Sequence, residues 1–262
     1  MTLRFKKFLQ ESQMDLHDVA DLINLNCKPF LSEVGRLSMY RGMDVSGDRK
    51  TLPSSSRHPP EREPRDSSPW FNLMFNGIIH AAYGIEDVRY RSYFAVGDIG
   101  AAAAYGDIFR VYPQGDFEFI WSESIEDSVL SENAILYAIV NSLRNKKQFV
   151  TDLMIKNLFK VLSKRTSTSN DLLDGTLDDE ITFCIQELSA GIDSPATPIN
   201  SQTFPQVFKE CLAEVGNKFY RTSDISAALR SNHEIIIHKS DGYYTIPLGY
   251  ADKDQIDMAL SL

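Results

Sequence analysis

The chain has 262 residues, of which 43% are apolar, 11% aromatic and 24% charged. This composition supports a full apolar core and excludes both wholesale disorder and a small scaffold held together by disulfides. The formal net charge of -9 argues against a general nucleic-acid-binding protein, although a local basic cleft stays compatible with it.

The sequence predicts a protein without a membrane partner. No stretch approaches the ~18 apolar residues of a membrane-spanning helix, and the N-terminus MTLRFKKFLQESQ lacks the apolar segment of a secretory signal. We therefore expect a cytoplasmic location. Cys27, Cys184 and Cys211 are far apart and form no CxxC pattern, so we expect reduced thiols. The five histidines show no metal-ligand spacing, and no metal is expected.

The first part of the chain is predicted to hold a helix, a short strand and a long loop. Apolar residues have helical spacing over 15–34, with Asp15 as the N-cap and Pro29 as a break. A strand is expected over 37–43. Residues 44–69 are polar and hold five of the eleven prolines, so we expect a flexible loop there.

Beta structure is predicted to cluster in the middle of the chain. Residues 70–84 have the pattern of a helix that ends at Gly84. After it we expect a strand over 89–98, a short alanine-rich helix over 99–107, and a strand pair over 108–122 that turns at Gln114-Gly115.

The remainder is interpreted as an insertion followed by a return to regular structure. Residues 131–202 are predicted to be a mostly helical insertion with loose connections. The last third is expected to hold a helix stopped by Gly216, a second helix capped by Ser223, and a hairpin turning at Asp241-Gly242. This order of elements predicts an α+β protein in which residues 1–262 form one domain.

Three motifs stand out along the chain. They are Tyr40-Arg41-Gly42, the segment from Arg91-Ser92-Tyr93-Phe94 to Ala103-Ala104-Tyr105-Gly106, and Asn232-His233-Glu234 before Ile235-Ile236-Ile237. Their order resembles the mono-ADP-ribosyltransferases, most closely the versions carried by tailed bacteriophages. The resemblance implies an N-terminal helix and a split antiparallel β core around a cleft for NAD, the substrate that donates ADP-ribose.

The resemblance also implies roles for individual residues. Glu234 would stabilise the positive charge on the ribose as nicotinamide leaves, and Arg41, followed by Gly42, would fork onto the pyrophosphate or a ribose. A hydroxyl-rich stretch of the family orients the glutamate. Here that stretch reads Phe94-Ala95-Val96-Gly97-Asp98, so Ser92, two residues earlier on the same strand face, is the expected substitute.

Three further residues are candidates for contact with the cofactor or the acceptor. Phe94 and Tyr105 would stack on nicotinamide. Asn232 stands where the family often reads its acceptor, and it is neither the Glu that accompanies arginine acceptors nor the Gln found with others. The acceptor stays open: a host protein is expected, with nucleic acid as an alternative. NAD would bind without a Rossmann fingerprint, because the sequence has no GxGxxG.

Each of these residues also has an ordinary structural interpretation. Arg41 alone would form a surface salt bridge, Glu234 would be a solvated strand end, and Ser92 would satisfy a neighbouring backbone group. In the polar loop, Arg62 and Arg65 belong either to a solvated linker or to a lid over the phosphates. Two other functions stay open, namely a non-catalytic virion or interaction protein that retains the fold, and an NAD glycohydrolase.

Overall fold

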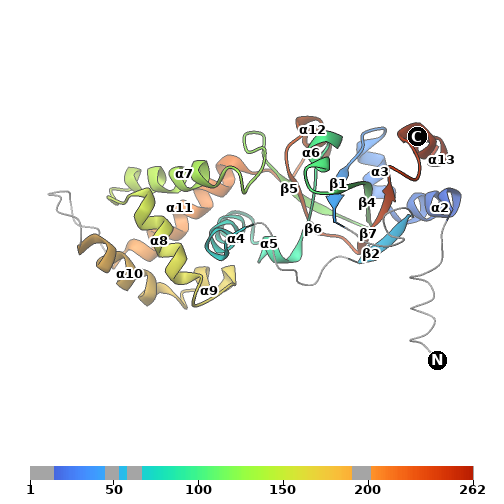
Figure 1. The fold of residues 1–262 in the computed structure, drawn as a ribbon. Helices are drawn as coiled ribbons and strands as arrows, with labels where there is room; N and C mark the ends of the chain where they lie inside the picture. Colours follow the sequence, from blue (N-terminus) through green and yellow to red (C-terminus); the bar gives the residue numbers. More distant parts are fainter. Residues whose placement is uncertain (1–14, 45–52, 58–66, 191–201, 262) are drawn as a thin grey trace, which may run out of the picture. The chain divides into compact units, whose positions relative to one another are not determined.

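The computed structural model describes residues 15–44, 53–57, 67–190 and 202–261. Helices and two antiparallel sheets make up the fold, which confirms the α+β class (Figure 1). The chain divides into two compact units, whereas the sequence predicted one domain. We name them the sheet unit, which is Met1–Pro60, Ser92–Glu123 and Arg221–Leu262, and the helical unit, which is Glu61–Arg91 and Ser124–Tyr220.

The sheet unit contains a four-stranded and a three-stranded sheet. The first has the order β1-β4-β7-β2, with β1 at Tyr40–Met43, β4 at Asp107–Gln114, β7 at Gly242–Pro247 and β2 at Ser54–Arg57. The second has the order β3-β6-β5, with β3 at Tyr93–Ala95, β6 at Ile235–Lys239 and β5 at Glu118–Trp121. All neighbouring strands are antiparallel.

Both predicted hairpins are wrong in their pairing. The chain turns after Gln114 and again before Gly242, as expected, but β4 and β5 belong to different sheets, and so do β6 and β7. The two turns lie against each other, because the Asp241 N–H donates to the Gln114 carbonyl at 3.2 Å. Gly115 takes a positive φ of 67° there. A glycine with positive φ serves a corner between sheets as well as a hairpin.

Helices α2 (Leu16–Asn26), α3 (Lys28–Val34), α6 (Ile99–Ala103), α12 (Ile225–Ser231) and α13 (Lys253–Ala259) complete the sheet unit. Asp15 caps α2 as predicted. The expected break at Pro29 falls instead at Cys27, and Pro29 lies in the first turn of α3, where its missing N–H costs no hydrogen bond. The N-cap of α12 is Asp224 and not Ser223, since the Asp224 side chain accepts from the Ala227 N–H.

The predicted flexible loop over 44–69 contains a strand. Within it, β2 pairs with β7, and the hydroxyls of Ser54 and Thr245 lie 2.7 Å apart. Sequence patterns miss this strand because Ser54–Arg57 carries no apolar alternation. Arg62 and Arg65 lie outside the described residues, so their expected role has no structural counterpart here.

The helical unit contains α4 (Pro69–Tyr83), α5 (Val88–Arg91), α7 (Glu132–Asn145), α8 (Asp152–Leu162), α9 (Ser169–Leu173), α10 (Asp178–Ala190) and α11 (Phe204–Phe219). The predicted helical insertion is thus part of a larger unit that also takes in α4 and α5. Gly84 ends α4 in the left-handed conformation, as predicted. The expected strand over 89–98 is shorter, because Val88–Arg91 forms a helical turn and only Tyr93–Ala95 is extended.

Gly216 does not stop its helix, contrary to the prediction. Helix α11 continues through it to Phe219, and Gly216 is buried against α4. A Cβ on Gly216 would lie 2.5 Å from the Ala82 Cβ and 2.8 Å from the Ile78 carbonyl oxygen. The glycine is therefore there because two helix backbones approach closely.

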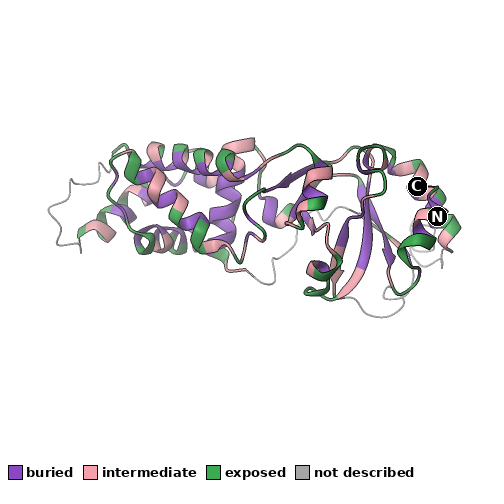
Figure 2. Ribbon diagram, turned by 90° about the horizontal axis from the view of Figure 1, so that it is seen from above, coloured by how far each residue is buried: buried purple, intermediate pink, exposed green. Residues whose placement is uncertain are grey.

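Buried residues follow the strands of the sheet unit and the inner faces of the helices in the helical unit (Figure 2). Helix α4 is buried on all sides from Trp70 to Ile79, as expected of a central core helix. The three cysteines, Cys27, Cys184 and Cys211, are buried and free. None of the helices over the described ranges is long and apolar enough to cross a membrane.

Candidate functional site

Arg41 lies at the centre of the candidate site in the sheet unit. Its guanidinium carbon is 5.8 Å from the ring centre of Tyr93 and 5.7 Å from that of Tyr243, and the two ring centres are 4.5 Å apart. Arg41 is half-buried, and its Nη1 is a buried atom with no hydrogen-bond partner among the described residues. A positive charge is thus held over two aromatic faces with one donor unused.

Gly42 and Tyr105 come together beside Arg41. A Cβ on Gly42 would lie 2.0 Å from the Ala102 carbonyl oxygen and 2.8 Å from the Tyr105 Cβ, so only glycine allows this approach. The Asp98 side chain caps α6 by accepting from the Ala101 N–H at 2.7 Å. Tyr105, just after α6, is 46% exposed. The first and second sequence motifs therefore meet, with an exposed aromatic ring at their junction.

The third motif, Asn232-His233-Glu234, lies at the end of the three-stranded sheet where β1 joins β3. Tyr40 and Val96 exchange two backbone hydrogen bonds of 2.8 Å, which join β1 to the end of β3. Ala95 pairs with Ile235, and the same register continued by one residue places Glu234 opposite Val96. Tyr40 and Glu234 are then two strand spacings apart, or roughly 10 Å.

Ser92 and Glu234 lie at opposite ends of the strand pair, so the structure does not bring these two predicted site residues together. Tyr93 pairs with Ile237, so Ser92 stands opposite His238, four residues along β3 from Val96. At the rise of an extended strand this is roughly 13 Å. Ser92 is fully buried, and its hydroxyl oxygen has no hydrogen-bond partner among the described residues.

The side chains of Arg41 and Glu234 lie on opposite faces of the three-stranded sheet. Arg41 lies over Tyr93, which faces the core that Ile235 and Ile237 also line. Side chains alternate along a strand, so Glu234 shares the other face with Phe94 and Ile236. A ligand touching both residues must pass around the end of the sheet at Val96.

Two hydrogen bonds hold the turn before Glu234. Asn232 is exposed and ends α12 in the left-handed conformation, with φ of 62°. The His233 N–H donates to the Ser231 hydroxyl at 3.2 Å, and the His233 ring Nδ1 donates to the Ser122 carbonyl at 2.7 Å. Because a carbonyl only accepts, Nδ1 carries the proton, and the short bond holds the residue next to Glu234.

Two aromatic partners of Arg41 were missed by the sequence prediction. Tyr93 is the neighbour of Ser92 on the opposite face, and Tyr243 comes from β7 on the other sheet. Burial raises the pKa of Tyr93 well above its ordinary value, against the opposing effect of a side-chain hydrogen bond to Ser240. Tyr93 is therefore a neutral phenol at physiological pH. No local pattern connects Tyr243 with Arg41, because the link depends on how the strands pair.

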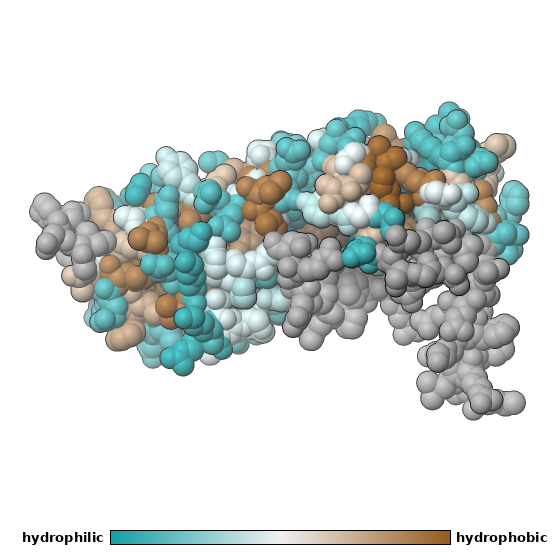
Figure 3. All heavy atoms as spheres, in the orientation of Figure 1, coloured by the Kyte–Doolittle hydropathy of each residue, from teal (hydrophilic) through white to brown (hydrophobic). Residues whose placement is uncertain are grey.

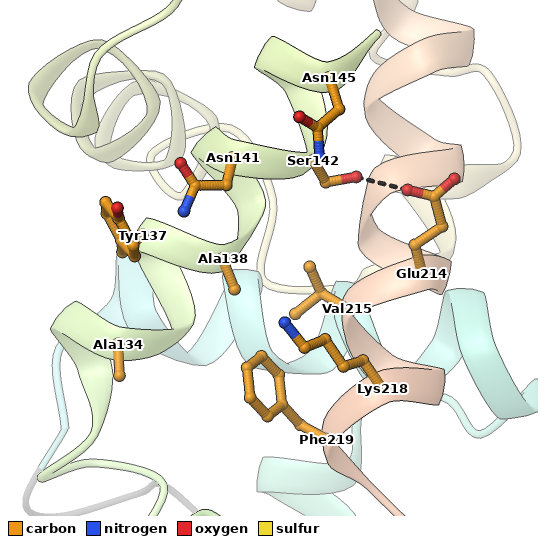
Figure 4. A pocket seen from close by; sticks show the side chains of 10 residues that line it. All are labelled: Ala134, Tyr137, Ala138, Asn141, Ser142, Asn145, Glu214, Val215, Lys218 and Phe219. Carbon is orange, nitrogen blue, oxygen red and sulfur yellow. Dashed lines mark hydrogen bonds between the residues drawn. The ribbon is translucent and has the colours of Figure 1, made fainter.

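The helical unit carries a pocket of about 440 Å³ between α7 and α11 (Figure 4). Two of its polar side chains are paired: Ser142 donates to Glu214 at 2.5 Å, and Lys146, beyond the pocket lining, contacts the same carboxylate at 2.8 Å. These bonds hold the pKa of Glu214 below its ordinary value. The Lys218 ammonium lies over the Phe219 ring at 5.2 Å. None of the predicted site residues lines this pocket.

No other feature of the described residues is a stronger candidate for a functional site than Arg41. On the face drawn in Figure 3, apolar side chains form small groups separated by hydrophilic ones. The described residues contain no group of three or more His, Cys, Asp or Glu that could hold a metal ion. In comparisons with protein-family models, curated proteins and solved structures, the chain matches none.

Proposed function

We propose that the chain is an ADP-ribosyltransferase that transfers ADP-ribose from NAD to a macromolecule, with a host protein as the expected acceptor. The observation that carries the proposal is the unused buried N–H of Arg41 beside Tyr93 and Tyr243. A buried donor without a partner is costly. An oxygen of the NAD diphosphate would pair with it in a charge-assisted hydrogen bond.

The proposed reaction divides its work between two residues. The bond between ribose C1′ and nicotinamide breaks, nicotinamide leaves as a neutral molecule, and Glu234 stabilises the positive charge that develops on the ribose. A lone pair of the acceptor then forms the new bond to C1′, and the acceptor loses its proton to solvent. Arg41 holds the diphosphate. A whole ribose separates the diphosphate from the bond that breaks, so the two residues do not need to touch.

Three other residues keep supporting roles in this proposal. Tyr105 offers an exposed ring beside Gly42 for stacking. Phe94 shares the sheet face of Glu234. Asn232 is exposed two residues before Glu234, where an acceptor would arrive. We propose no catalytic role for Ser92, because it lies at the far end of the strand pair.

A second candidate function is a non-catalytic protein that binds an anionic ligand through Arg41. The observation that favours it is the placement of Glu234, which belongs to the sheet face opposite to the Arg41 guanidinium. An NAD glycohydrolase would use the same two residues, with water in place of the acceptor.

Incubation of the full chain with NAD and a cell lysate separates these functions. NAD labelled in its adenylate phosphate reports transfer, and nicotinamide release reports cleavage. We expect label on macromolecules with the wild type and at least a tenfold lower rate with Glu234→Gln, while the exposed control Glu33→Gln keeps the wild-type rate. Free labelled ADP-ribose alone would indicate a glycohydrolase. NAD binding without cleavage would favour the non-catalytic candidate.

A further inference from the structure

Arg110, on β4, is an arginine that the proposed function does not use. It is 1% exposed and lies on the face of the four-stranded sheet opposite to Arg41. Its Nη1 donates to the Asp257 carboxylate of α13 at 2.5 Å. Its guanidinium carbon is 5.5 Å from the ring centre of Tyr112. A nearly inaccessible positive charge is thus neutralised by one carboxylate from a short C-terminal helix.

Two further donors of Arg110 have no partner. Nε and Nη2 are buried and form no hydrogen bond with any residue that the structure describes. These two nitrogens form one edge of the guanidinium, with parallel N–H bonds that match two oxygens of a carboxylate or phosphate. The Tyr112 hydroxyl, on a side chain that is 1% exposed, is also buried without a partner among the described residues. Burial raises the pKa of Tyr112, so this hydroxyl keeps its proton.

Charge decides what this edge can bind. Arg110 and Asp257 form a neutral pair, and a third, anionic group at the same place would leave a buried net negative charge, which is unfavourable. An anion therefore has to replace Asp257. Helix α13 suits such an exchange, because it has only seven residues and Asp257 is 17% exposed. Helix α13 packs on the sheet unit through Ile256 and the adjoining Leu260, which are buried in the core.

We propose that Arg110, with the Tyr112 hydroxyl, is a second anion-binding site that takes a carboxylate or phosphate group, and that Asp257 of α13, bound to Nη1 of the same guanidinium, opposes the ligand through its negative charge. The site is separate from the proposed NAD site, because Arg41 and Arg110 lie on opposite faces of their sheet. Binding there releases α13. An anion bound at this site would regulate the protein. The residues of the site are different from those of the proposed catalytic site.

Inorganic phosphate titrated into the full chain tests the proposal by calorimetry. We expect Asp257→Asn to bind phosphate at least tenfold more tightly than the wild type, because the competing charge is gone. Adding Arg110→Lys to that variant should abolish the gain, and adding Arg41→Lys should leave it in place. A gain that disappears with Arg41→Lys instead would overturn the proposal, and so would equal affinities of Asp257→Asn and the wild type.

Hydrogen exchange on the wild type gives a second test that needs no variant to fold. Saturating phosphate should speed exchange of the α13 amides at least severalfold, while the amides of α7 in the helical unit keep their rates. Unchanged α13 exchange at saturating phosphate would contradict the release of this helix.

Discussion

Ser92 and Glu234 lie at opposite ends of the pairing between β3 and β6. Ser92 stands opposite His238 and Glu234 opposite Val96, four residues apart along the strand, which is roughly 13 Å. No rotamer of a serine spans that distance. The separation divides the three residues that the sequence placed in one site, and the proposed reaction depends on Arg41 and Glu234 alone.

Replacement of Ser92 by alanine should therefore leave nicotinamide release unchanged. The hydroxyl has no hydrogen-bond partner among the described residues, so its removal also leaves no polar group unpaired. Urea unfolding of Ser92→Ala should give a free energy at least as large as that of the wild type, because a buried hydroxyl without a partner is removed. A rate loss as large as that of Glu234→Gln would show that the serine acts in the reaction.

Replacement of Gly42 by alanine should destabilise the sheet unit. The new Cβ would overlap the Ala102 carbonyl oxygen at 2.0 Å, and a backbone atom cannot move aside as a side chain can. Overpacking of this kind costs about 1–3 kcal/mol, and we expect the upper part of that range. The control Gly249→Ala places its Cβ in open space and should stay within about 0.5 kcal/mol of the wild type. Equal unfolding free energies for the two variants would contradict the close approach of α6 to β1.

Replacement of Gly216 by alanine tests the contact between α4 and α11. In an exposed helix this change stabilises by about 1 kcal/mol. Here the Cβ meets Ala82 at 2.5 Å and the Ile78 carbonyl at 2.8 Å, so we expect a loss of about 1–3 kcal/mol in thermal or urea unfolding. The double variant with Ala82→Gly removes one of the two clashes and should recover part of the loss. A stabilised Gly216→Ala would mean that the helices are farther apart.

Stability should fall at alkaline pH because of Cys27. Burial raises the pKa of this thiol to about 12 from its ordinary value of 9.0. The unfolded chain ionises first, so the contribution is fully present below pH 9 and is lost as pH rises toward 12. We expect the free energy of unfolding in urea to drop by about 1 kcal/mol between pH 8 and pH 10 on this ground. Cys27→Ala should show a smaller drop, and an identical pH dependence would argue that the thiol is not buried.

Local signals in the sequence predict local structure well. Asp15 and Gly84 mark helix ends because a side-chain cap and a left-handed residue act within a few positions. The turns at Gln114-Gly115 and Asp241-Gly242 are also where they were expected. Their strands pair with distant partners and not with each other, because the choice of partner depends on the packing of both sheets and not on the turn.

The candidate site was predictable only in part for the same reason. Gly42 and Tyr105, which belong to two of the sequence motifs, lie close together. Tyr243 lies beside Arg41 through the pairing of β7 with β4 and of β4 with β1, which no single segment encodes. At Gly216 the sequence predicted a helix end, but the helix continues through it. A glycine that ends a helix and a glycine that allows close packing look alike in a sequence.

The affinity of the full chain for NAD tests the central claim, that Arg41 holds the diphosphate, most directly. Calorimetry should compare the wild type with Arg41→Lys, which keeps the charge but loses the fork, and with Arg36→Lys, an exposed control on the same unit. We predict at least tenfold weaker binding for Arg41→Lys and unchanged binding for Arg36→Lys, with both variants as stable as the wild type. NAD binding that is equally tight in Arg41→Lys and the wild type, or absent from the wild type, would contradict the claim.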